Sequence, residues 1–290
     1  MLLEMAIGDA YGAGFEYVRD RRFVRTHNTL EGYIQHPRHR LKPGRYTDDT
    51  QMSLAIAEHI IAGKPWTGEA IADSFVETFR RDRPFREGYS GGFFGLLKKV
   101  KTGRELLALL RPTSDKSGAA MRAAPIGVFP TAEAVVEKCT VQARITHDTR
   151  DGINAACVVA LMSHYMLYRL GPLRDMPAFL RRHVEGAWDE PWRGEVGSRG
   201  WMSVRAALTA LTQRTSLSKV LMTCISFTGD VDTVAAIALA VGSHATELHQ
   251  DLPRVLMNQL ENGPYGREHL AGVNWQLMQR MAGIRAASIR

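Results

Sequence analysis

The feature that most constrains the fold is a continuous apolar run late in the chain, from Val234 to Val241. All its residues are Ala, Val, Ile or Leu, and the run is far shorter than the ~20 residues of a membrane span. A helix that is apolar on every side must be buried in a protein core. Elsewhere the apolar spacing is helical, strict alternation is scarce, and Ala, Leu, Met, Glu and Arg dominate the periodic segments. The sequence therefore predicts an all-α fold that contains this run as a central helix.

The composition is ordinary for a globular chain, with 45% hydrophobic and 23% charged residues among 290. No Pro-, Gly- or Ser-rich linker is long enough to separate domains, so we expect one domain over residues 1–290. The three cysteines lie far apart and lack metal-ligand spacing, which indicates a reducing, cytoplasmic compartment. No apolar run predicts a membrane segment.

The net charge of +7 suits an anionic partner such as a nucleotide diphosphate. The commoner explanation of such a charge is Lys and Arg side chains that only solvate the surface. No long basic run or aromatic-interleaved basic patch supports nucleic acid as a partner, and nothing in the composition excludes it.

A first acidic motif, Thr47 to Gln51, stands where a helical pattern begins. We predict that Asp48 caps this helix and that Gln51 completes a capping box. A cap needs one oxygen acceptor, so a well-capped helix leaves Asp49 unexplained. Both carboxylates lie where the helix dipole favours negative charge.

A second acidic motif, Gly229 to Thr233, opens the central apolar helix and contributes Asp230 and Asp232. If the two motifs meet, four carboxylates and two threonines share one small volume. Such crowding is tolerable only with a cation, because buried like charges repel strongly. An all-oxygen ligand set favours Mg²⁺, Mn²⁺ or Ca²⁺ over Zn²⁺. We therefore expect a hydrolytic site with two hard cations at two helix N-termini.

Smaller signals surround these motifs. The first helical segment carries Gly8 and Gly12 one turn apart, which predicts close helix packing. Glu16 follows it in a turn, where a lone acid is more often solvated than functional. Two polar loops precede helices, Gly88–Gly92 and Thr113–Gly118, and such loops bind phosphate or simply turn. His147 lies between two helices, where it either caps the second or faces a ligand.

Taken together and in this order, the motifs resemble the ADP-ribosylglycohydrolase family over nearly the whole chain. The resemblance rests on Gly8-Asp9-Ala10-Tyr11-Gly12, Thr47-Asp48-Asp49-Thr50, Gly88-Tyr89-Ser90-Gly91-Gly92, Gly118-Ala119-Ala120-Met121-Arg122, Ile145-Thr146-His147 and Gly229-Asp230-Val231-Asp232-Thr233. It implies a compact, single-domain, orthogonal bundle of helices with two Mg²⁺ ions, for which Mn²⁺ is a possible substitute. It implies the metal ligands Thr47, Asp48, Asp49, Asp230, Asp232 and Thr233, with Asp48 and Asp232 as shared ligands.

The resemblance also implies an activity, the hydrolysis of an ADP-ribosyl glycosidic bond that releases ADP-ribose from a modified protein or a small conjugate. Arginine is the favoured acceptor. The implied catalytic groups are Asp48, Asp49, Asp232 and Glu16, and either a ligand carboxylate or Glu16 takes the proton from water. The implied ADP-ribose contacts are Gly88, Tyr89, Gly91, Gly92, Ser114, Ser117, Gly118 and His147.

Two departures from the family pattern stand out. Thr228 occupies a position where the family often has a second Gly, and the segment Lys116–Gly118 replaces a frequent Gly-Asn-Gly. Two alternatives remain open at this point. The chain binds ADP-ribose without cleaving it, or Asp230-Val231-Asp232-Thr233 belongs to an Asp-x-Asp phosphatase, whose motif follows an early strand in an α/β chain.

Overall fold

The computed structural model describes residues 1–82 and 85–288. Within them the structure consists of helices, with isolated β-bridges between loops and no strand. The all-α prediction is therefore confirmed. The second acidic motif begins a helix late in this helical chain, so the described residues lack the strand that the phosphatase alternative requires.

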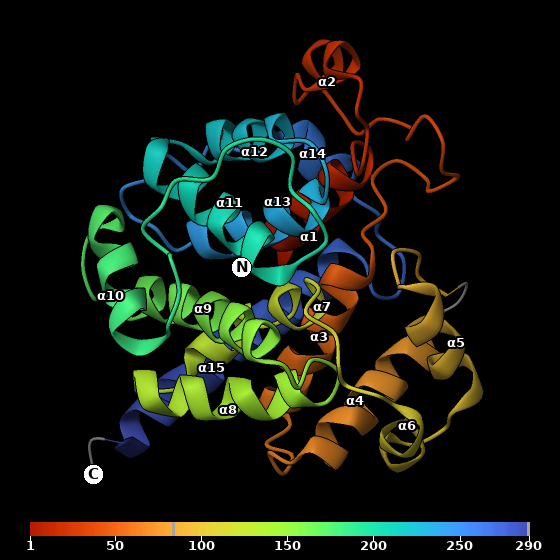
Figure 1. Ribbon diagram of the computed structural model, residues 1–290, viewed down its shortest axis with the longest axis vertical. Helices are drawn as coiled ribbons and strands as arrows, with labels where there is room; N and C mark the ends of the chain where they lie inside the picture. The colour runs from red at the N-terminus through yellow and green to blue at the C-terminus, as the bar shows by residue number, and fades with distance from the viewer. Residues whose placement is uncertain (83–84, 289–290) are drawn as a thin grey trace.

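Helix α13 (Val231–Gly242) is the centre of the fold, as predicted, because every one of its residues is buried. Helix α1 (Leu2–Ala13) packs along it, and α11 (Gly200–Gln213) and α12 (Leu217–Ser226) cover other sides of it. Figure 1 shows α13 and α1 side by side below α12, with α11 on the other side of α13. Two helices from opposite ends of the chain thus form the core that carries the second acidic motif.

The predicted close packing at Gly8 and Gly12 is found between α1 and α13. A Cβ atom on Gly8 would lie 2.5 Å from the carbonyl oxygen of Ala235, and one on Gly12 would overlap the Cα atom of Asp232. The two backbones are therefore in van der Waals contact at the head of α13. Any side chain at Gly12 would push Asp232 away from α1.

Helix α3 (Asp48–Ile61) carries the first acidic motif and packs against α1, α4 (Gly68–Arg81) and α15 (Arg267–Ser288). The predicted cap is wrong by one residue: Thr47 is the N-cap, and its side chain accepts a hydrogen bond from the Asp49 amide. Gln51 forms no capping box. Its amide nitrogen lies 3.1 Å from Asp82 Oδ2, and its Oε1 accepts a hydrogen bond from the Tyr89 hydroxyl.

The remaining elements complete the walls of a cleft and the outer layer. These elements are α2 (Arg21–His27), α5 (Gly91–Lys99), α6 (Gly103–Leu109), α7 (Gly118–Met121), η1 (Ala124–Val128), α8 (Ala132–Arg144), α9 (Arg150–Leu167), η2 (Leu173–Asp175), α10 (Met176–His183) and α14 (Arg254–Gln259).

Among the described residues, no helix is both long and apolar enough to cross a membrane.

Candidate functional site

The N-termini of α3 and α13 meet at the floor of a cleft of about 560 Å³. The two acidic motifs, far apart in sequence, contribute to the same cavity, and Glu16 joins them from the turn after α1. The acidic lining consists of Glu16, Asp48, Asp49, Asp230 and Asp232, with Thr233 beside them. The structure thus brings together all four carboxylates that the sequence singled out.

Burial and mutual repulsion disfavour the charged forms of these carboxylates. Burial, followed by the charge of Asp9, raises the pKa values of Asp48 and Asp49 well above their ordinary range. Asp49 Oδ1 is buried and has no hydrogen-bond partner within residues 1–82 and 85–288. A buried carboxylate oxygen without a partner is costly unless a cation or a proton satisfies it. This orphaned oxygen fits a hard cation bound at the head of α3.

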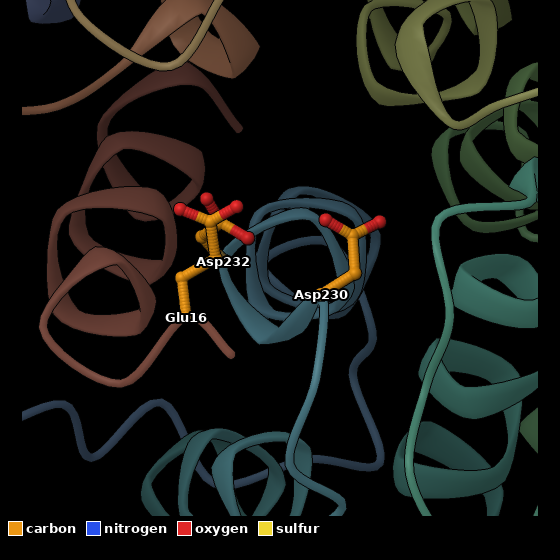
Figure 2. Close-up of side chains that lie close together, drawn as sticks. All are labelled: Glu16, Asp230 and Asp232. Atoms are coloured by element: carbon orange, nitrogen blue, oxygen red, sulfur yellow. The ribbon is translucent and has the colours of Figure 1, made fainter. Parts of the chain in front are cut away.

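Three carboxylates form a compact group around the head of α13. Glu16, Asp230 and Asp232 each offer an oxygen, and these oxygens lie within 4.8 Å of one another. In Figure 2 the carboxylates of Glu16 and Asp232 lie next to each other, with Asp230 across from them. Burial and the nearby charges of Asp230 and Asp9 raise the pKa of Glu16 to about 7. Glu16 is thus part of the acidic cluster, not the solvated acid that its sequence context alone favoured.

Asp230 is the best satisfied of the four motif carboxylates. Its Oδ2 accepts a hydrogen bond of 3.0 Å from the Ser203 hydroxyl, which lies on α11. Burial raises the pKa of Asp230 to about 6, and hydrogen bonds from Ser203 and Ser117 limit that rise. The turn before it is strained, because Thr228 adopts φ +65° and Gly229 φ +91°. A left-handed backbone at position 228 favours glycine, which gives a physical reason for the Gly that the family often has there.

The sequence reasoning gave Asp9 no role, and the structure shows that it holds the first acidic motif in place. Its side chain is fully buried and accepts hydrogen bonds from the backbone N–H and the hydroxyl of both Thr47 and Thr50, at 2.6–3.0 Å. These bonds lock the first turn of α3 and leave Asp48 and Asp49 directed at the cleft. The sequence does contain a signal for this role. Asp9 stands between Gly8 and Gly12, on a helix that close packing would bury.

The first polar loop forms one wall of the cleft. Gly88, Ser90 and Gly92 line the cavity, and Gly88 needs its lack of a side chain, because it adopts φ +98° and a Cβ there would overlap Asp48 Oδ1. Tyr89 instead turns inward, and its hydroxyl donates a 2.6 Å hydrogen bond to Gln51 Oε1. The structure thus places Tyr89 as an anchor of the loop. Gly91 begins α5, and neither it, Tyr89 nor Thr47 is among the lining residues.

The second polar loop and His147 form another part of the cleft wall. Ser114, Ser117, Gly118 and His147 line the cleft. His147 does not cap α9, because the Thr149 side chain is the N-cap and accepts from the Gly152 amide at 3.1 Å. Burial and the charge of Arg122 lower the pKa of His147 to about 3, so the ring is neutral.

The comparisons with known proteins agree with this geometry. The family model described as ADP-ribosylglycohydrolase matches residues 1–286. The chain is 25% identical to an ADP-ribosyl-[dinitrogen reductase] glycohydrolase of Rhodospirillum rubrum, covering 89% of this chain and 88% of that protein. It is 25% identical to ADP-ribosylhydrolase ARH3 of Xenopus tropicalis, covering 83% and 84%.

Two further similarities bear on the family and the fold. The chain is 25% identical to ADP-ribosylarginine hydrolase Tri1 of Pseudomonas putida, covering 82% of this chain and 67% of that protein. A solved structure titled ADP-ribosylglycohydrolase-related protein complex superposes with a TM-score of 0.73 at 20% identity, over 97% of this chain and 96% of that one. The match to the family model spans almost the whole sequence, and the chain belongs to the ADP-ribosylglycohydrolase family, whose named members hydrolyse glycosidic bonds.

Proposed function

We propose that this protein hydrolyses the glycosidic bond of an ADP-ribosylated protein, releases ADP-ribose, and depends on two Mg²⁺ ions. The observation that carries the proposal is the meeting of four buried carboxylates from two distant motifs, with Asp49 Oδ1 unpartnered beside a cleft. Such an arrangement is unfavourable in the protein alone and becomes favourable with hard divalent cations.

The proposed ligands divide between the two helix N-termini. Thr47, Asp48 and Asp49 would serve from α3, and Asp230, Asp232 and Thr233 from α13. When bound, the ions would orient the ribose hydroxyls and polarise a water molecule for attack at the anomeric carbon. Asp9 stabilises the ligands on α3 indirectly, because it accepts hydrogen bonds from the hydroxyls of Thr47 and Thr50.

Two carboxylates are candidates for the group that accepts the proton of the attacking water. Asp49 has an oxygen without a partner, and Glu16 lies beside Asp230 and Asp232. Both remain candidates for the general base, since a base must reach the water directly or through one other water. Glu16→Gln separates them, because Asp49 is also a proposed metal ligand. If Glu16 is the base, this substitution lowers kcat without weakening metal binding; if kcat is retained, the base is Asp49.

The cleft above the acidic floor suits the rest of ADP-ribose. Glycine and serine groups of the two polar loops, with His147, line the same cavity and would hold the pyrophosphate. Phe93, Leu96 and Leu110 add an apolar surface, which suits a nucleobase. The three cysteines are free and buried, which supports the expected cytoplasmic location.

The decisive experiment measures free ADP-ribose released from mono-ADP-ribosylated arginine and serine peptides, with Mg²⁺ and with EDTA. Similarity to Tri1, named an ADP-ribosylarginine hydrolase, favours the arginine peptide. Asp48→Asn is expected to abolish the release of ADP-ribose. Asp151 is an exposed acid on α9, and Asp151→Asn serves as the matched control that should retain release.

Binding without turnover is the alternative to this activity. Calorimetric titration with ADP-ribose in Mg²⁺ separates the two, because a silent member would bind ADP-ribose yet leave every ADP-ribosyl conjugate intact. Release that persists in EDTA would contradict the metal dependence.

A further inference from the structure

The wall of the cleft contains a buried cation whose hydrogen bonds, among the residues that the structure describes, go to neutral groups. Arg122 is 1% exposed. Its guanidinium donates to Gln142 Oε1 at 2.8 Å, to the Gln142 carbonyl at 3.3 Å and to Thr146 Oγ1 at 2.7 Å, and its Cζ lies 4.6 Å from the centre of the Phe75 ring. Burial lowers the pKa of Arg122 to about 10, so it is charged at neutral pH. A buried charge with only neutral partners is costly, which points to a role beyond packing.

The Thr146 hydroxyl connects the Arg122 guanidinium to the His147 ring through two hydrogen bonds. Arginine has no acceptor, so Thr146 Oγ1 must accept from Arg122. The same oxygen lies 2.6 Å from His147 Nδ1. A charged donor on an oxygen strengthens the hydrogen bond that this oxygen donates. Among the described residues, the hydrogen bonds of Thr146 Oγ1 run to Arg122 and to His147 Nδ1, so the hydroxyl proton points to Nδ1.

The direction of this bond determines where the imidazole proton lies. A neutral histidine carries one N–H, and when Nδ1 accepts a hydrogen bond the proton is on Nε2. His147 lines the cleft. The Nε2 edge of its ring lies against Gly118, where an added Cβ would come within 3.3 Å of Nε2 and 3.0 Å of Cε1. Glycine at position 118 therefore avoids a tight contact that any other residue's Cβ would make with that edge.

We propose that Arg122 and Thr146 are positioning residues that hold His147 in its Nε2–H tautomer, so that the ring donates a hydrogen bond to an oxygen of the bound ligand. The ligand's identity as ADP-ribose rests on the proposed function, whereas the tautomer does not. His147 is then a fixed donor, and neither a general base nor a metal ligand. A donor suits a diphosphate oxygen, which can only accept.

Long-range ¹H–¹⁵N NMR of the histidine rings tests the tautomer directly. The His147 signals are assigned among the ten histidines by comparison with His147→Gln. The wild-type ring is expected to be neutral and protonated on Nε2 from about pH 5.5 to pH 8. Thr146→Val removes the hydroxyl and is expected to give a mixture of tautomers, whereas Thr146→Ser keeps the hydroxyl and is expected to retain Nε2–H.

Calorimetric titration with ADP-ribose tests the consequence for binding. Thr146→Val is expected to raise the Kd about tenfold, the effect of one lost hydrogen bond, and Thr146→Ser is expected to leave it within about twofold. In the His147→Gln background, Thr146→Val should add little further loss, since both substitutions affect the same bond.

A wild-type spectrum with the proton on Nδ1 would overturn the proposal without any variant, so a misfolded variant cannot rescue it. Retention of both the tautomer and the affinity by a folded Thr146→Val would overturn it as well. If ADP-ribose does not bind the wild-type protein, the proposed function fails, while the spectrum still decides the tautomer.

Discussion

The two acidic motifs reach the same cleft but are stabilised in opposite ways. At the head of α3 the threonines are satisfied, since Asp9 binds both, while Asp49 Oδ1 has no partner. At the head of α13 the carboxylates themselves are hydrogen-bonded, because Ser203 donates to Asp230 and the Thr233 amide donates to Asp232 Oδ1. Asp230 of the second motif is therefore held by hydrogen bonds, whereas Asp49 Oδ1 of the first motif is not, and a bound cation would satisfy it.

The largest effect is expected from Asp9→Ala, because it removes the acceptor for four donors of the first motif. Buried amides and hydroxyls would lose their partner, and we expect a loss of roughly 3–5 kcal/mol in the free energy of unfolding. Asp20→Ala is the matched control, since Asp20 also accepts two backbone N–H groups but at the exposed N-cap of α2. Asp20→Ala should lower the free energy of unfolding by about 1 kcal/mol. Equal losses in chemical denaturation would refute the special role of Asp9.

The pH dependence of stability comes next. Burial and the charges of Asp230 and Asp9 raise the pKa of Glu16 to about 7, and burial raises that of Asp230 to about 6. The folded state therefore binds more protons than the unfolded state between about pH 4 and pH 7. The free energy of unfolding of the metal-free protein should therefore fall as the pH rises through this range, by about 1–3 kcal/mol relative to the Mg²⁺-loaded protein.

Denaturation curves in EDTA and in excess Mg²⁺ measure this difference at each pH. The loaded protein is the proper reference, because acids outside the cleft, such as Glu58, have lowered pKa values and change stability in both forms. A constant difference between the two forms from pH 5 to pH 7 would contradict the electrostatic account of the site.

A pair of substitutions compares the two motifs directly. Asp49→Asn removes a buried charge with an unpartnered oxygen and should stabilise the metal-free protein by about 1–2 kcal/mol. Asp230→Asn removes a charge that hydroxyl groups already stabilise, so it should stabilise the metal-free protein less than Asp49→Asn does. Both should weaken Mg²⁺ binding by more than about tenfold. Melting temperatures and Mg²⁺ titrations check the pair, and a larger gain from Asp230→Asn would reverse the comparison.

The smallest effect is expected from Ser203→Ala. Loss of its bond to Asp230 should cost about 1 kcal/mol and weaken Mg²⁺ affinity several-fold, since outer-shell groups orient ligands. Ser53→Ala removes a buried hydroxyl that donates to the Met121 carbonyl at 3.2 Å, and should lower stability without changing Mg²⁺ affinity. Unchanged Mg²⁺ affinity in Ser203→Ala would show that Asp230 does not need this support.

The predictable parts were those that depend on a local pattern. The buried run at α13, the glycines of α1 and the acidic residues at two helix starts all follow from sequence spacing. The roles of Asp9 and Arg122 did not, because each depends on contacts with another element, α3 for Asp9 and the end of α8 for Arg122. The cap at Asp48 was wrong for the same reason. Thr47 and Asp48 are both good caps, and only the distant carboxylate of Asp9, which fixes Thr47, selects between them.

The contact of α1 with α13 also has a consequence for how the protein is made. The two helices are more than 200 residues apart, and at ribosomal rates of about 5–20 residues per second α13 is synthesised roughly 10–45 s after α1. Until then the glycine face of α1 lacks the partner it fits, and the nascent chain must expose it or cover it with a chaperone. The acidic floor of the cleft, which includes the head of α13, therefore cannot form until that helix has been made.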